Sequence, residues 1–204
     1  MSDSIPEPIA APILAPQIAA GSSTSYFTPV KTLVRYDSIP LSALTAILRV
    51  VTEDEGGWIL EHEPDGSDGD WTYGGMTAKT FEAYFDVHIS QIDDALLHFP
   101  AMLTELKQWI ICVYYQEFYA PLFQFATSHA ETVPTAAHFS CGVNCGTETA
   151  KLLMQKAATG TKTVDLPKQF IKVWIDHYVA IAVENHEKLP DLAGWVSRAW
   201  KYLP

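Results

Sequence analysis

The stretch from Ser38 to Trp58 constrains the fold most, because an apolar helical pattern stops there on acidic residues and a glycine pair. Apolar side chains recur through it at helical spacing, at Leu44, Ile47, Leu48 and Val51. Ser38 suits an N-cap and Pro40 a first helical turn, whereas Gly56-Gly57 is typical of a helix end. The sequence therefore predicts a helix to about Asp54.

A polar loop and a second helix follow this stop. Residues 58–73 are predicted to form a short β-hairpin or an Ω-loop, and Thr77 is predicted to cap a helix over 78–85. Further apolar stripes predict helices at about 93–99, 102–119, from 134 through 143, 148–158, from 165 and from 190. Pro121 is expected to end the helix over 102–119. The fold class is therefore predicted to be mainly α, with a small loop or β-hairpin after the first helix.

Composition excludes several classes of protein. Hydrophobic residues make up 48% of the 204, as in a globular chain. The net charge of −11 argues against a nucleic-acid partner, since phosphate binding needs excess Lys and Arg. Three cysteines give no disulfide framework, and the apolar runs are too short to span a bilayer. The N-terminus lacks the basic region of an ordinary signal peptide.

The chain is predicted to have an extension and two packed parts. Residues 1–37 form an N-terminal extension or arm, whose first 25 residues are rich in Pro, Ala, Ile and Ser and favour extended conformations. Such a segment is either a tail or an anchor along another protein. Residues 38–160 form the main helical domain, and residues 161–204 form a C-terminal helical segment on the same core.

Glu55 is the candidate catalytic residue, because it lies just past a helix with Trp58 nearby. A glycosidic oxygen needs a proton in the transition state, and a carboxyl group walled by apolar groups has a raised pKa and can supply it. A second group would stabilise the sugar cation or position a water. The first candidate is Asp70, followed by Asp68 and Asp65, and Thr72 could hold the water. The plain alternative is a solvated acidic helix end followed by turn-forming aspartates.

The order Glu55-Gly56-Gly57, an acidic Pro/Gly loop, then Thr72-x-x-Gly75-x-Thr77 resembles the glycoside hydrolase family 108 lysozymes. These are N-acetylmuramidases found largely as bacteriophage endolysins, with the signature His-Glu-Gly-Gly, an Asp-Pro-rich loop ending in Gly-Gly, and Thr-x-x-Gly-Ile-Thr. Later blocks resemble the family too, at Tyr115, Tyr119, Val143-Asn144-x-Gly146, Ala150, Gln155, Tyr178, Gly194-Trp195 and Arg198. The resemblance covers about residues 43–203.

The resemblance implies a lysozyme-like helical fold whose segment 161–204 binds peptidoglycan. It implies hydrolysis of the β-1,4 bond between N-acetylmuramic acid and N-acetylglucosamine, with Glu55 as general acid and without a cofactor or metal. The implied substrate-binding residues are Trp58, Asp68, Tyr73, Thr77, Tyr115 and Asn144. The partner would be the glycan strands of the wall, reached from the host cytoplasm after release.

The chain departs from the family at Asp54, where the family has His, and at Asp70, where it has the second loop glycine. These departures leave open a module without catalysis. The acidic charge and the Pro/Ala-rich tail leave open a virion-associated version with residues 1–37 bound to a phage structural protein, and a lytic transglycosylase also stays open, since one acid can serve that chemistry. Zinc is a further alternative, with ligands at His138, Cys141, Cys145 and Cys112. Because no Cys-x-x-Cys knuckle accompanies them, these cysteines are expected to be small buried hydrophobes.

Overall fold

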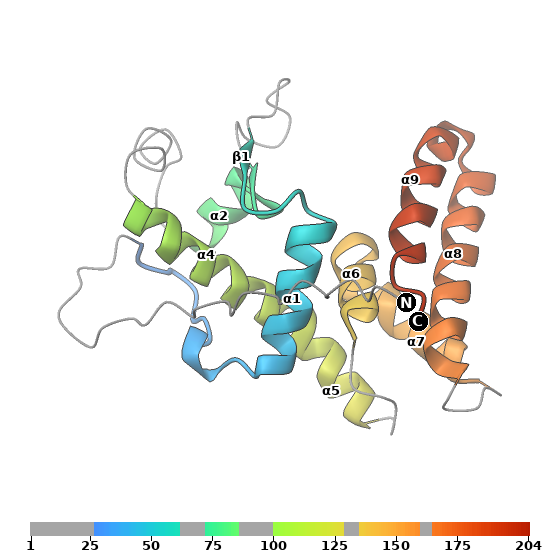
Figure 1. Cartoon of the computed structure of the whole chain (residues 1–204), viewed down its shortest axis with the longest axis horizontal. Coiled ribbons are helices and arrows are strands. Elements are labelled where there is room, and N and C mark those ends of the chain that lie inside the picture. The colour runs from blue at the N-terminus through green and yellow to red at the C-terminus, as the bar shows by residue number, and fades with distance from the viewer. Residues whose placement is uncertain (1–26, 62–71, 86–99, 129–134, 160–164) are drawn as a thin grey trace, which may run out of the picture.

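The computed structural model describes residues 27–61, 72–85, 100–128, 135–159 and 165–204, and within them the fold is mainly α with one small antiparallel sheet (Figure 1). This confirms the predicted fold class. The helix expected at 93–99 and the loop aspartates lie outside the described residues. None of the described helices is long and apolar enough to cross a membrane.

The first helix, α1 (Leu41–Glu53), runs through the middle of the molecule (Figure 1). Its core-facing stripe repeats every three or four residues, at Ala43, Ala46, Ile47, Val50 and Val51. The predicted N-cap at Ser38 is wrong, because Ser38 instead ends a short 3₁₀ turn (Tyr36–Ser38) and its hydroxyl donates to the Arg35 carbonyl. Pro40 takes the cap position, without a side-chain hydrogen bond.

A three-stranded sheet follows α1, in the order β1 (Leu60–Glu61), β2 (Thr72–Tyr73) and β3 (Met76–Thr77). The turn between β2 and β3 is Gly74-Gly75, and both residues have positive φ, 58° and 77°, which favours glycine. Helix α2 (Ala78–Tyr84) begins directly after β3. Thr77 caps it as predicted, since its hydroxyl accepts the Thr80 N–H at 3.2 Å.

The long central helix is longer than predicted. Helix α4 (Pro100–Tyr114) runs into a π-helical turn (Tyr115–Tyr119) and then into α5 (Ala120–Ser128). The prediction that Pro121 ends the helix is therefore wrong. A proline disrupts a helix by losing a hydrogen bond and by clashing with the carbonyl four residues earlier, and a wider π turn just before it relieves that conflict.

The C-terminal half is a stack of helices. Helix α6 (Ala136–Cys145) meets α7 (Thr147–Ala158) at Gly146, whose φ is 86°. Helix α8 (Leu166–Glu184) leads through a short 3₁₀ turn (His186–Lys188) to α9 (Leu189–Trp200), which returns beside it (Figure 1). Prolines stand in the first turns of α8 and α9, where no N–H is needed.

A single hydrophobic cluster joins these elements, from Phe27 in the N-terminal arm to Tyr202 after α9. Phe27 is buried against the Phe81 ring, at a centroid distance of 5.2 Å. The Val30 N–H donates to the Tyr84 carbonyl at 2.8 Å. The arm from Phe27 onward is thus part of the packed body.

Candidate functional site

The end of α1 places two carboxyl groups side by side in sequence but in different surroundings. At the end of α1, the N–H groups of Asp54 and Glu55 both donate to the Val50 carbonyl, at 2.8 and 3.2 Å. Gly56 and Gly57 then have φ of 75° and 80°, and the Gly57 N–H donates to the Val51 carbonyl at 2.9 Å. The glycine pair ends the helix as predicted.

Asp54 is the buried member of the pair, with a side chain that is 0% exposed. Its carboxylate accepts hydrogen bonds from the Ser140 hydroxyl on α6 and from the Tyr202 hydroxyl at 2.8 Å, and it pairs with the Lys201 ammonium at 3.3 Å. Lys201 also donates to the Glu53 carbonyl at 2.8 Å. Asp54 therefore fixes the end of α1 to α6 and to the C-terminal end of α9.

Glu55 points the other way, toward the turn between β2 and β3. A Cβ on Gly75 would lie 2.8 Å from the Glu55 Cβ and 2.5 Å from the Tyr114 hydroxyl, so this turn packs directly on the glutamate. The Tyr114 hydroxyl donates to the Gly74 carbonyl at 3.1 Å. Glu55 itself is half-buried, and its Oε1 is buried without a hydrogen-bond partner among the described residues.

This environment raises the pKa of Glu55. Burial is the largest cause of this increase. The positive charge of Arg198 on α9 lowers the pKa, the negative charge of Asp54 raises it, and the Asn144 amide lowers it. Glu55 in turn helps to raise the pKa of Tyr114, for which burial is the main cause. A half-buried carboxyl group with a raised pKa can hold a proton for transfer.

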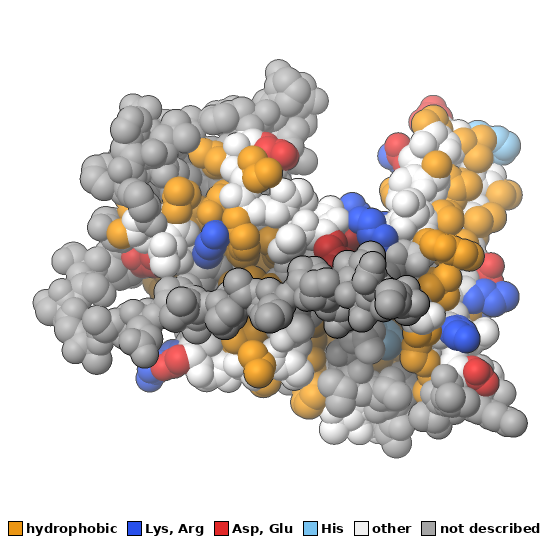
Figure 2. Space-filling model, viewed as in Figure 1, with side chains coloured by type: hydrophobic (Ala, Val, Ile, Leu, Met, Phe, Trp, Pro, Cys, Tyr) orange, Lys and Arg blue, Asp and Glu red, His pale blue; other side chains and the backbone are white. Residues whose placement is uncertain are grey.

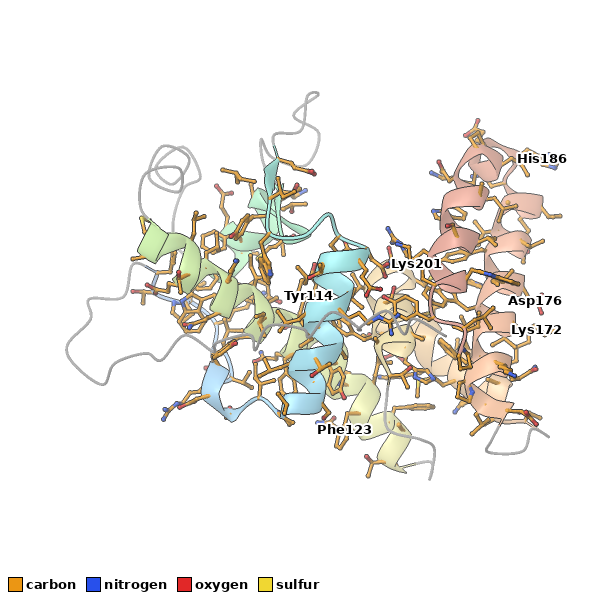
Figure 3. The ribbon with its side chains drawn as sticks, viewed as in Figure 1. Tyr114, Phe123, Lys172, Asp176, His186 and Lys201 are labelled. Carbon is orange, nitrogen blue, oxygen red and sulfur yellow. The ribbon has the colours of Figure 1, made fainter. Side chains whose placement is uncertain are left out.

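The surface around this centre is hollowed between the body that carries the sheet and the α8–α9 pair (Figure 2). Acidic and basic side chains gather at the foot of this hollow in Figure 2, and Lys201 lies there between α1 and α9 (Figure 3). The Arg198 guanidinium reaches the Asp54 carbonyl at 3.4 Å, from the α9 side. The charged centre thus combines residues from α1, α6 and α9.

The predicted second catalytic group falls outside the described part of the chain. This applies to Asp70, Asp68 and Asp65 alike. Thr72, the predicted water ligand, lies on β2 and is half-buried. Thr77, predicted to bind substrate, uses its hydroxyl to cap α2.

The two predicted aromatic contacts, Tyr73 and Trp58, lie side by side. Tyr73 is only 3% exposed and lies 5.6 Å from the Trp58 ring, so its ring belongs to the core and not to a sugar-binding surface. Trp58 is half-buried, lies against the turn at Gly74, and has the Lys107 ammonium 5.1 Å from its ring centroid. Trp58 therefore supports the turn that covers Glu55.

Tyr114 reaches Glu55 from the long helix, whereas Tyr115, predicted to bind substrate, points elsewhere. Neighbouring residues on a helix point about 100° apart, and the Tyr115 ring stacks instead on Tyr119 at 5.9 Å. Asn144, the remaining predicted substrate contact, is exposed on α6 and donates to the Ser140 carbonyl at 2.8 Å. Its influence on the pKa of Glu55 places it beside the glutamate.

Several residues of the centre were not predicted from the sequence: Asp54, Tyr114, Ser140, Lys201 and Tyr202. Only Asp54 could have been noticed in the sequence, because it stands where the family 108 lysozymes have His. Glu61, exposed on β1, is a further carboxyl near the site, with an oxygen 3.8 Å from where a Gly56 Cβ would lie. The other contacts depend on tertiary packing and carry no local sequence pattern.

The zinc alternative gains no support within the described residues, where no three His, Cys, Asp or Glu side chains form a group suited to a metal ion. His138 uses Nδ1 to cap α6. Cys112 is buried on α4, where burial first and then the Asp37 charge raise its pKa. A separate hollow of about 340 Å³ lies near His138, Lys201 and Tyr202. Glu55 and the sheet do not line it, so it is not the proposed substrate site.

Comparison of the chain with family models, curated proteins and solved structures finds no match.

Proposed function

We propose that this chain is a peptidoglycan hydrolase that cleaves the β-1,4 bond between N-acetylmuramic acid and N-acetylglucosamine, with Glu55 as general acid. The observation that carries the proposal is the Glu55 carboxyl, which is half-buried, has a pKa raised by burial, and is packed under a glycine turn. The spaced resemblance to family 108 lysozymes supplies the substrate class.

In this proposal a glycan strand lies across the hollow with one glycosidic oxygen at Glu55. The protonated carboxyl gives its proton to that oxygen as the bond to the sugar breaks, which removes the cost of a poor leaving group. Arg198 then stabilises the carboxylate that forms, since its positive charge favours the ionised state. Asp54 acts in the opposite direction and helps to keep Glu55 protonated before the reaction.

A lytic transglycosylase is the second candidate. Asp54, the carboxyl adjacent to Glu55, is held by three donors, namely Ser140, Tyr202 and Lys201, and has no exposed surface. Of these two adjacent carboxyl groups, only Glu55 can therefore act as an acid. A transglycosylase needs only one acid–base residue, because the sugar's own hydroxyl attacks the reacting carbon.

Digestion of purified peptidoglycan by the wild type, Glu55→Gln and Glu53→Gln tests both candidates. Glu53 is a matched control, because it is an exposed acid on the same helix that pairs with Arg49. Glu55→Gln should lower the rate at least about 100-fold, as expected for loss of a general acid, whereas Glu53→Gln should leave it unchanged. Circular dichroism of each variant checks that the fold is retained.

The mass of the products separates the two reactions. Hydrolysis adds one water and leaves a reducing end, whereas transglycosylation leaves a 1,6-anhydro sugar of lower mass. Full activity in Glu55→Gln would refute the proposal, and wall binding with no product at any pH from about 4 to 8 would leave a module without catalysis. Mass spectrometry of purified phage particles tests the virion-associated version.

A further inference from the structure

The three-stranded sheet beside Glu55 has one apolar face and one polar face. One row of side chains across the strands packs on the hydrophobic core: Leu60, Tyr73 and Met76. In the alternate row, the strand register pairs Glu61 with Thr72 and Thr72 with Thr77. Residues directly opposite each other point to the same side of a sheet, so this polar row occupies the outer face.

Glu61 is the carboxyl group of this outer face, and its side chain reaches back toward the proposed general acid. Its two carboxylate oxygens lie 3.8 and 4.0 Å from where a Cβ on Gly56, the residue after Glu55, would stand. Because consecutive Cα atoms are about 3.8 Å apart, the nearer oxygen lies within about 9 Å of the Glu55 Cα. Two carboxyl groups roughly 6.5–9.5 Å apart can act on one glycosidic bond from opposite faces of the sugar. Glu61 therefore lies within reach of the bond at Glu55.

The two carboxyl groups lie in opposite environments. Glu55 is half-buried under the glycine turn, whereas Glu61 is exposed and has no hydrogen-bond or ion-pair partner in the part of the chain that the structure describes. Burial favours the protonated form of a carboxyl group, which suits an acid, whereas an exposed carboxyl group is charged in neutral solution and can accept a proton. Such a difference in surroundings assigns the acid and the base of a pair.

Thr72 provides a second polar contact for a water molecule. It lies directly opposite Glu61 on β2, where paired Cβ atoms are about 4.5–5.5 Å apart. Thr72 is half-buried, and its hydroxyl has no hydrogen-bond partner among the residues placed by the structure. The Thr77 hydroxyl, next in the row, is instead used to cap α2. A water beside Glu61 can therefore donate to the carboxylate and accept from the Thr72 hydroxyl.

We propose that Glu61 is the catalytic base, which activates a water held by Thr72 and gives inversion at the reacting carbon. This inference rests on the proposed hydrolase function. The water oxygen bonds to C1 of N-acetylmuramic acid, and the water passes one proton to the Glu61 carboxylate. The bond from C1 to the glycosidic oxygen breaks, its electron pair stays on that oxygen, and the proton of Glu55 joins it. Glu61 then releases its proton to solvent and Glu55 takes one up.

Kinetics on purified peptidoglycan test the role of Glu61, with Glu53→Gln as the control for loss of an exposed acid. Glu61→Gln should lower kcat at least about 100-fold with little change in KM, as expected for loss of a general base. Thr72→Val keeps the side-chain shape and removes the hydroxyl, so kcat should fall about fivefold, the effect of one hydrogen bond. Circular dichroism checks the fold of each variant.

Azide rescue is the readout that a structural role of Glu61 would not move. Azide is a small anion that attacks C1 without needing a base, so sodium azide should raise the rate of Glu61→Ala and give a glycosyl azide. Proton NMR of the wild-type reaction on a soluble glycan should show the α reducing end first, because the cleaved bond is β and the carbon inverts.

The outcomes separate this inference from the proposed function. Full activity in Glu61→Gln, no azide product from Glu61→Ala, a β reducing end released first, or a 1,6-anhydro product would overturn the role of Glu61 while Glu55 remains the acid. Full activity in Glu55→Gln, or a wild type that cleaves no peptidoglycan, would overturn the proposed function and this inference with it.

Discussion

Acidification should destabilise the protein through His138, the buried imidazole in the first turn of α6. Its side chain is 7% exposed and lies against Phe170. Its Nδ1 accepts the Thr135 N–H at 3.0 Å, which places the proton of the neutral ring on Nε2. Burial lowers the pKa of His138 from 6.5 to about 4, because the charged form loses its hydration.

The direction and size of the effect follow from this pKa. Between pH 6.5 and about 4 the unfolded chain binds a proton at this histidine that the folded chain does not. Stability from the neutral ring is therefore fully present above pH 6.5, falls as the pH drops, and is lost below about 4. At about 1.4 kcal/mol per pKa unit, the total loss is about 3 kcal/mol.

Urea unfolding measured by circular dichroism from pH 7.5 to 4 checks this value. His138→Gln is the control, since its amide oxygen can accept the Thr135 N–H and does not titrate. The carboxyl groups titrate in both proteins, so their contribution cancels in the difference. The free energy of unfolding of the wild type should fall about 3 kcal/mol more than that of the variant. Parallel profiles would refute the reasoning.

Two substitutions near the proposed site give further predictions, each measured by urea unfolding. Gly75→Ala should cost more than Gly57→Ala, because both have φ near 80° but only the first Cβ is crowded, with the Glu55 Cβ at 2.8 Å; equal losses would contradict this. Tyr202→Phe should lower the free energy of unfolding by about 1.5–3 kcal/mol with an unchanged m-value, because it removes a hydrogen bond to the Asp54 carboxylate. A loss below about 0.5 kcal/mol would show that this bond contributes little.

The elements that the sequence predicted correctly are those with a local cause. Apolar spacing located α1, α7, α8 and α9 to within a few residues, and a positive φ at Gly56 and Gly57 accounts for the predicted helix end. Thr77 was predicted as a cap because its hydroxyl needs only the next turn of its own helix. Each of these signals depends on residues close together in the chain.

The errors arise where the decisive partner is distant in sequence or where helix geometry is irregular. A π turn cannot be seen in an apolar pattern, so Pro121 was expected to end a helix that continues through it. The contact of Tyr114 with the turn at Gly74 likewise joins residues 40 positions apart and carries no local signal. Asp54 carries the charge expected of a solvated helix end, yet its donors come from α6 and α9.

The bonds of Asp54 to α9 join residues 144 to 148 positions apart. Contacts of such separation close a long loop, so they form only when the last helix docks on the body. No local segment can therefore assemble this acidic centre ahead of the rest of the molecule. In a chain whose last helix has not yet docked, the Asp54 carboxylate would be exposed to water. Such a chain would also lack the Arg198 guanidinium beside Glu55, which lowers the pKa of that carboxyl group.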